Sequence, residues 1–177
     1  MRLHSRPRLT LKITSSRWLL IFFVLAGLFS GCGTQTSEKK TGAKAPDFTL
    51  PRLPGDSQVT LSKINGEKPV LLAFWASWCP SCVEEIPALN EMQAKYGDRN
   101  FEILSVNVQE PREDVMKFMK EKEIAYSVAL DEDGEVASSY GLVGLPASVL
   151  LAKGGEILYY GFTLPENPEQ YFEPGTV

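Results

Sequence analysis

The hydrophobic pattern divides this chain into three parts. Residues 18–31 (WLLIFFVLAGLFSG) form one continuous apolar run. Residues 33–45 (GTQTSEKKTGAKA) are polar and lack aromatic residues, which is typical of a flexible tether. From residue 46 onward, short apolar runs alternate with segments of helical periodicity. The pattern predicts a leader over residues 1–31, a tether over 32–45 and one folded domain over 46–177, as a length of 177 residues allows.

Within the domain, strand and helix patterns alternate. Residues 70–75 (VLLAFW) are apolar without alternation, as expected for a central strand buried on both faces. A helix over 82–96, ended by Gly97, leads to a second strand over 101–108, so these two strands should be parallel. Shorter strands are expected at 48–50, 58–61, 126–130, 147–151 and 156–162, and further helices at 113–123 and 135–140.

These elements form an α/β sandwich with mixed strand directions. Turn residues at 54–56 (PGD) and 153–155 (KGG) predict a hairpin near each end of the domain. In the helix over 113–123, four apolar residues are expected to face the core: Val115, Met116, Phe118 and Met119.

Composition and charge exclude several classes of protein. With 44% hydrophobic and 23% charged residues, the chain is not fibrous, disordered or a multi-span membrane protein. The only histidine, His4, lies at the extreme N-terminus, which argues against histidine-based catalysis or metal binding in the domain. Five of the 18 basic residues lie in 1–31, which leaves 13 basic and 22 acidic residues, a formal charge of −9, in the remainder. We therefore expect no nucleic-acid partner for the folded part.

The leader has the pattern of an export signal. Residues 1–17 are basic, and the following apolar run of 14 residues spans about 21 Å, less than the ~30 Å hydrocarbon core of a bilayer. The sequence Leu28-Phe29-Ser30-Gly31-Cys32 resembles a bacterial lipoprotein signal, which implies lipidation of Cys32. Because Phe29 stands where such signals usually have leucine, an uncleaved anchor and simple secretion remain alternatives. All three place the domain outside the cytoplasm, where cysteine pairs can be oxidised.

The most specific feature is Cys79-Pro80-Ser81-Cys82, which follows the expected central strand and opens a helix. Free amide N–H groups and the positive end of the helix favour a thiolate at Cys79. Pro80 suits the first helical turn because its missing N–H costs nothing there. Cys82 should be more buried and should resolve a mixed disulfide formed by Cys79. The spacing predicts a redox-active dithiol.

Two simpler interpretations explain the dithiol less well. A zinc site needs about four nitrogen or sulfur ligands, and Cys32 is the only other cysteine. An inert disulfide across so short a loop would remove little entropy from the unfolded chain. We therefore expect thiol–disulfide exchange with neither a metal nor a cofactor.

Three segments resemble the thioredoxin superfamily, most closely its exported TlpA/ResA-like thiol–disulfide oxidoreductases. They are GAKAPDFTL (42–50), LLAFWASWCPSCVEEIPALN (71–90) and YGLVGLP (140–146), and the resemblance runs from about residue 42 to 162. It implies a thioredoxin-like three-layer sandwich: a mixed central sheet with an N-terminal hairpin and one helix–strand insertion at 113–130. The family closes with a helix that the proline-rich tail 163–177 does not predict. Either one sheet face is partly uncovered or a short helix around 166–172 substitutes.

The resemblance also implies site residues. Cys79 matches the attacking cysteine and Cys82 the resolving one, which implies a Cys79–Cys82 disulfide in the oxidised protein. Pro146 matches the cis-proline that lies against the dithiol. Leu145, just before it, would offer backbone groups to a substrate chain. Trp78 matches an aromatic residue beside the dithiol, as Trp75 does, although Trp75 could equally be a core residue.

Glu85 follows Cys82 by three residues on the same helix face. In the family, the matching glutamate is regarded as a proton donor or acceptor for the buried thiol. Ala73 occupies the position where plain thioredoxins keep a buried aspartate, so a replacement carboxylate is physically reasonable. The alternative is a solvated glutamate that favours the helix dipole, a role better suited to Glu84.

The resemblance implies a reductase of protein disulfides, such as the haem-attachment cysteines of apocytochrome c, that is itself reduced by a membrane thiol donor. The strong oxidants of the superfamily place histidine beside the second cysteine, and this chain has serine there. A peroxiredoxin would need proline and threonine where Leu72 and Ala76 stand. A copper-delivering thioredoxin-fold protein would need a wider cysteine spacing and a histidine.

Overall fold

A computed structural model describes residues 40–97 and 99–172, and the leader with Cys32 lies outside these residues. Its strands are β1 (Thr49–Leu53), β2 (Gln58–Thr60), β3 (Val70–Trp75), β4 (Glu102–Val108), β5 (Ser127–Asp131), β6 (Ala147–Leu151) and β7 (Ile157–Gly161). Its helices are α2 (Leu61–Asn65), α3 (Pro80–Tyr96), α4 (Arg112–Glu121), α5 (Glu135–Ser139) and α6 (Glu169–Phe172). The described residues contain no helix long and apolar enough to cross a membrane.

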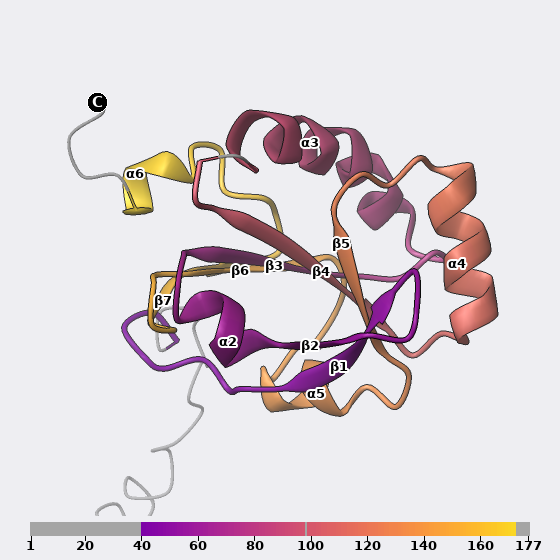
Figure 1. Cartoon of the computed structure of the whole chain (residues 1–177), viewed down its shortest axis with the longest axis horizontal. Coiled ribbons are helices and arrows are strands. Elements are labelled where there is room, and N and C mark those ends of the chain that lie inside the picture. The colour runs from indigo at the N-terminus through magenta and orange to yellow at the C-terminus, as the bar shows by residue number, and fades with distance from the viewer. Residues whose placement is uncertain (1–39, 98, 173–177) are drawn as a thin grey trace, which may run out of the picture. The chain divides into compact units, whose positions relative to one another are not determined.

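The strands form a mixed seven-stranded sheet in the order β2-β1-β5-β4-β3-β6-β7 (Figure 1). Strands β3, β4 and β5 are parallel to one another, as expected for strands connected through helices. Both predicted hairpins form, β1 with β2 and β6 with β7. The insertion contributes α4 and β5, and β5 lies between β4 and the N-terminal hairpin.

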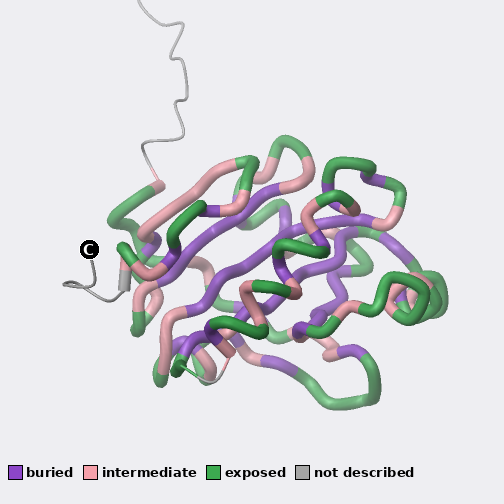
Figure 2. The backbone as a smooth tube through the Cα atoms, turned by 90° about the horizontal axis from the view of Figure 1, so that it is seen from above, coloured by how far each residue is buried: buried purple, intermediate pink, exposed green. Residues whose placement is uncertain are grey.

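Helices cover both faces of the sheet, so the predicted three-layer sandwich is confirmed. Along β3, Leu72 and Phe74 pack toward the face covered by α2 and α5, whereas Leu71 and Ala73 pack toward the face covered by α3. Strand β3 is buried along its whole length, as its unbroken apolar run predicts. Figure 2 shows the buried backbone concentrated in the central strands.

Two details differ from the sequence-based prediction. Leu61 begins helix α2 instead of ending a strand, because Asp47 Oδ1 accepts the Ser62 N–H at 2.8 Å and caps the helix from outside it. In α4, Met116 is exposed instead of facing the core. Val115 and Met119 occupy the inward face, and Met116 lies about 100° around the helix from Val115.

The C-terminal tail contains the short helix that was one of the two alternatives. Tyr171 of α6 packs with Leu164 against the cluster under α3. Tyr96 donates its hydroxyl to Glu169 Oε2 at 2.5 Å, and Lys95 lies 3.5 Å from the same carboxylate. The tail therefore covers part of the same sheet face as α3.

Candidate active site

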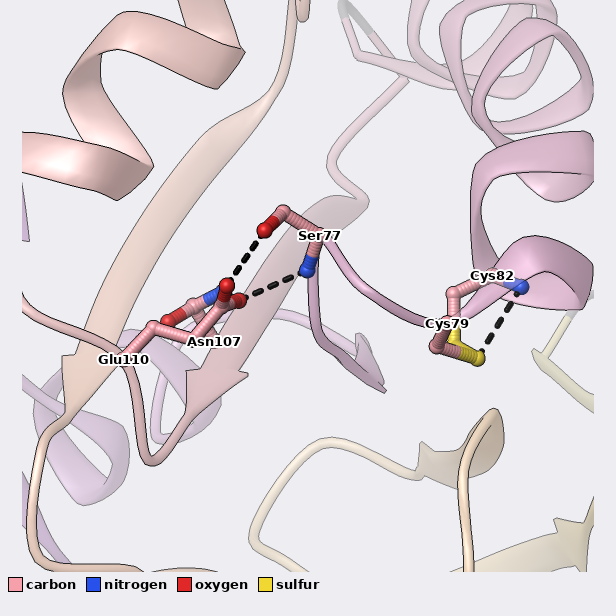
Figure 3. The surroundings of a disulfide bond; sticks show 5 residues. All are labelled: Ser77, Cys79, Cys82, Asn107 and Glu110. Carbon is pink, nitrogen blue, oxygen red and sulfur yellow. Dashed lines mark hydrogen bonds between the residues drawn. A yellow bond between two sulfur atoms is a disulfide. The ribbon is translucent and has the colours of Figure 1, made fainter.

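The two domain cysteines form a disulfide at the start of α3 (Figure 3). Their sulfurs are 2.13 Å apart and their Cα atoms 5.3 Å apart. Cys79 is the N-cap of α3, and its sulfur accepts the Cys82 backbone N–H at 3.3 Å. Pro80 occupies the first helical turn, as predicted. The two residues are 5% and 3% exposed, so the predicted difference in burial is small.

A tight turn delivers Cys79 from the central strand to the helix. Strand β3 ends at Trp75, and the Cys79 N–H donates to the Ala76 carbonyl at 3.2 Å. The disulfide packs in a cluster with Trp75, Val115 and Leu145. The rigid strand and the helix start thus hold the dithiol from both sides.

Trp75 is both a core residue and part of the wall around the dithiol. It is buried, its Nε1 donates to Ser105 Oγ at 3.2 Å, and its ring lies 5.5 Å from that of Phe118. The sequence left open whether Trp75 is a core residue or a neighbour of the dithiol, and in the structure it is both.

The peptide bond between Leu145 and Pro146 is cis, as the resemblance implies. Leu145 packs against the cluster that contains both cysteines. Next to the dithiol in the chain, Trp78 is 67% exposed, and Val143, two residues before Leu145, is 89% exposed. Sequence analysis did not single out Val143, although an apolar residue beside an expected cis-proline could have indicated it.

Glu85 is half-buried on α3, about one turn beyond Cys82, whereas Glu84 is exposed. Burial raises the pKa of Glu85 to about 7, against a smaller opposing effect of a hydrogen bond from the Leu164 backbone N–H. Burial, with a contribution from the Glu85 charge, also raises the pKa of Tyr126 above its usual range. Glu85 is therefore not a fully solvated surface carboxylate, and both of its protonation states are populated near neutral pH.

Sequence analysis missed a polar cluster behind the dithiol turn, formed by Ser77, Asn107 and Glu110 (Figure 3). Glu110 is 7% exposed and accepts hydrogen bonds from both of the other residues. In the sequence, Glu110 stands in a polar loop before Pro111 and carries no signal of burial. The described residues contain no group of three or more His, Cys, Asp or Glu side chains placed to hold a metal ion.

Comparison with known proteins agrees with this geometry. Residues 41–160 match the model of the AhpC/TSA family. The thiol-disulfide oxidoreductase ResA of Bacillus thuringiensis is 32% identical over 162 residues, which cover 88% of this chain and 92% of the relative. The protein of the same name from Geobacillus kaustophilus is 33% identical over 159 residues, or 88% of this chain and 90% of the relative.

Solved structures give the same result. The structure of a putative thiol:disulfide interchange protein DsbE from Chlorobium tepidum superimposes with a TM-score of 0.66 and 38% identity, covering 73% of this chain and 91% of that one. The chain therefore belongs to the AhpC/TSA family, with a thioredoxin-like fold, and to the ResA-like thiol–disulfide oxidoreductases within it.

Proposed function

We propose that this oxidoreductase works outside the cytoplasm, anchored to a membrane, and reduces disulfides in protein substrates. The observation that carries the proposal is the dithiol at the N-terminus of α3, packed in one cluster with the residue before the cis-proline. In the reduced protein, the Cys79 thiolate attacks a substrate disulfide and releases one substrate thiolate. Cys82 then attacks the mixed disulfide and releases the second. Two electrons pass to the substrate, and the protein ends as the Cys79–Cys82 disulfide.

The local geometry supports Cys79 as the attacking residue. As the N-cap of α3, its sulfur faces the Cys82 N–H and the positive end of the helix, and both favour a thiolate. Cys82 lies inside the helix, within bonding distance of the Cys79 sulfur. Its thiolate can therefore attack that sulfur in the mixed disulfide, form the Cys79–Cys82 bond and expel the substrate thiolate.

Glu85 is suited to carry the proton of Cys82. Its ionised form accepts the proton as Cys82 attacks the mixed disulfide, and its protonated form returns the proton when the dithiol is regenerated. A pKa of about 7 allows both steps near neutral pH.

The substrate chain is proposed to lie over Cys79, beside the cis-proline. The backbone of Leu145 offers hydrogen bonds to an extended chain beside Pro146. Trp78, next to Cys79 in the chain, and Val143, two residues before Leu145, present exposed apolar side chains. A substrate that covers both would bury apolar surface without any rearrangement of the core.

Trp78→Ala should raise KM for a protein disulfide about tenfold and leave kcat nearly unchanged, because it removes apolar contact area but no reacting group. Trp78→Phe should recover most of the affinity. Reduction of a small-molecule disulfide, which buries far less apolar surface than a protein chain, serves as the control. A loss of kcat on both substrates would show that Trp78 instead supports the dithiol itself.

The proposed location and partners rest on the leader and on the similarity to ResA. A lipidated Cys32, or the leader over 1–31 if it is not cleaved, would anchor the domain, with the tether over 33–45 between the anchor and the domain. The proposed substrate is the oxidised haem-attachment cysteine pair of apocytochrome c, and the proposed electron donor is a membrane thiol protein.

The reduction potential of the Cys79/Cys82 couple tests the direction of electron flow. For a reductase we expect a value closer to that of thioredoxin, about −270 mV, than to that of the strong oxidant DsbA, about −120 mV. The full chain in detergent should also reduce an oxidised peptide that contains a Cys-X-X-Cys-His segment. A potential near that of DsbA, or no reduction of the peptide, would contradict the proposal.

The two rival functions can be tested with the same protein. A peroxiredoxin would need proline and threonine where the buried residues Leu72 and Ala76 lie, so we expect no consumption of peroxide beyond the rate of a simple thiol. Metal analysis of the protein after copper loading tests whether it binds copper, as a copper-delivering protein must.

A further inference from the structure

The turn that carries the dithiol leaves the N–H groups of its two central residues outside its own hydrogen bond. The Cys79 N–H closes the turn on the Ala76 carbonyl, so Ser77 and Trp78 are its central residues. The Ser77 N–H cannot bond within such a turn. It donates instead to Glu110 Oε2 at 2.6 Å, and the Ser77 hydroxyl donates to Glu110 Oε1 (Figure 3).

The same carboxylate is tied to the neighbouring strand. Asn107 Nδ2 donates to Glu110 Oε2 at 2.7 Å. Asn107 is fully buried near the end of β4 and pairs with Trp75, the last residue of β3. Glu110 thus receives three donors in a site that is almost closed to solvent. A carboxylate is stable there only because these hydrogen bonds replace its hydration.

The backbone before Glu110 adopts a conformation that favours glycine. Gln109 has φ +57°, and its N–H donates to the Asp131 carbonyl at 2.9 Å, so β5 holds it in place. This residue turns the chain after β4 so that Glu110 reaches the dithiol turn. A non-glycine residue keeps such a conformation only where the surrounding structure imposes it, and such residues cluster at functional sites.

We propose that Glu110 is a positioning residue for the thiol chemistry, which holds the Ala76–Cys79 turn so that the Cys79 sulfur stays at the N-terminus of α3. The inference rests on the proposed function, since it assigns a role in the same dithiol. Glu110 acts through Ser77, whose N–H and hydroxyl it binds. When the turn is held, the Cys79 sulfur faces the Cys82 N–H, and the thiolate is stabilised.

Glu110 affects the stability of the Cys79 thiolate in two ways, and the two effects have opposite signs. Its negative charge, acting through space, disfavours a thiolate at Cys79. Its hydrogen bonds favour the thiolate because they keep the sulfur at the helix start. If only the charge of Glu110 were lost, the alkylation pH profile of Cys79 would shift to lower pH. If the Cys79 sulfur left its place at the start of the helix, the profile would shift to higher pH.

The experiment compares Glu110→Ala with Glu110→Gln in the reduced full chain. Alkylation of Cys79 by iodoacetamide is followed between pH 5 and 10 by mass spectrometry of the peptide that contains it. Alanine leaves the Ser77 N–H without an acceptor. Glutamine, with its carbonyl oxygen in the place of Oε2, can still accept from both the Ser77 N–H and Asn107 Nδ2, while its amide donates to Ser77 Oγ. Glu113→Gln, the same change at an exposed carboxylate on α4, is the matched control.

We expect Glu110→Ala to shift the profile to higher pH, so that alkylation at pH 7 slows about tenfold. Glu110→Gln, which loses the charge but keeps the hydrogen bonds, should alkylate at least as fast as the wild type at pH 7, and Glu113→Gln should stay within about twofold of it. Lower-pH shifts in both Glu110 variants would show that the charge acts alone and would overturn the proposal. An unchanged profile in Glu110→Ala would also overturn it.

A milder variant covers the case in which Glu110→Ala does not fold. Ser77→Ala removes the hydroxyl bond but keeps the N–H bond, so it should slow alkylation at pH 7 about threefold, and no slowing would overturn the proposal. Alkylation reports on the thiol without any substrate. A wild type that fails to reduce disulfides would therefore refute the proposed function, and the alkylation profiles would still decide the role of Glu110.

Discussion

Replacing Cys82 with alanine is expected to stop turnover and to leave the protein joined to its substrate through Cys79. The first attack needs only the Cys79 thiolate, but release of the substrate needs the second sulfur, which lies one helical turn away. Steady-state reduction of a protein disulfide should fall by about 10³-fold or more, while mixed disulfides accumulate. Non-reducing gels and mass spectrometry of the trapped peptide measure both effects.

Two control variants show which sulfur forms the mixed disulfide with the substrate. Cys79→Ala should neither turn over nor trap substrate. Cys32→Ser should be combined with each variant, because Cys32 is the third cysteine of the chain. Substrate trapped in Cys79→Ala and absent in Cys82→Ala would reverse the proposed roles of the two domain cysteines.

Replacing Glu85 with glutamine should remove the pH dependence of the resolving step. In the wild type, the rate at which Cys82 resolves the mixed disulfide should rise through about pH 7 as Glu85 ionises and becomes able to accept the proton. Glu85→Gln should slow this step about 10²-fold at pH 8, with a smaller effect at pH 5. Rapid-quench measurements of a preformed mixed disulfide across this pH range test the prediction.

Glu84→Gln is the matched control, because it makes the same change on the neighbouring, exposed side chain. It should leave both the rate and its pH profile unchanged. If the rate of the resolving step fell equally in the two variants, the cause would be a general effect of charge on the helix. If the rate did not fall in Glu85→Gln, Glu85 would have no part in the mechanism.

The same substitution should stabilise the folded protein at high pH. Because burial raises the pKa of Glu85 from 4.5 to about 7, the folded state holds a proton that the unfolded state has released between these values. The contribution of Glu85 to stability is therefore present below pH 4.5 and is lost as the pH rises through about 7. At pH 8, Glu85→Gln should increase the free energy of unfolding by about 1–2 kcal/mol, a value reduced for solvent screening of a half-buried group. Urea unfolding at pH 5 and pH 8 measures the difference.

Local patterns in the sequence predicted most of the fold. The unbroken apolar run over 70–75 predicted the central strand, because only a strand covered on both faces can bury every side chain. The polar turn residues at 54–56 and 153–155 predicted the two hairpins. Helix α2 was missed because its capping carboxylate, Asp47, lies 15 residues before the N–H that it accepts.

The sequence also indicated the dithiol, and the resemblance added the cis bond before Pro146. The catalytic and binding roles assigned to Cys79, Cys82, Glu85, Trp78, Leu145 and Pro146 remain predictions. Lipidation of Cys32 remains one as well, because that residue lies outside the described part of the chain.

By itself, the sequence determined the strand–turn–helix segment that carries the two cysteines, because their spacing, Pro80 and the buried strand before them are all local features. Only the tertiary structure decided how that segment is held. Glu110 reaches Ser77 because β3 and β4 pair side by side and Gln109 turns the chain back at their ends. The burial that raises the pKa of Glu85 likewise depends on the packing of α3 against segments distant in the chain, and no spacing of residues along one segment encodes either contact.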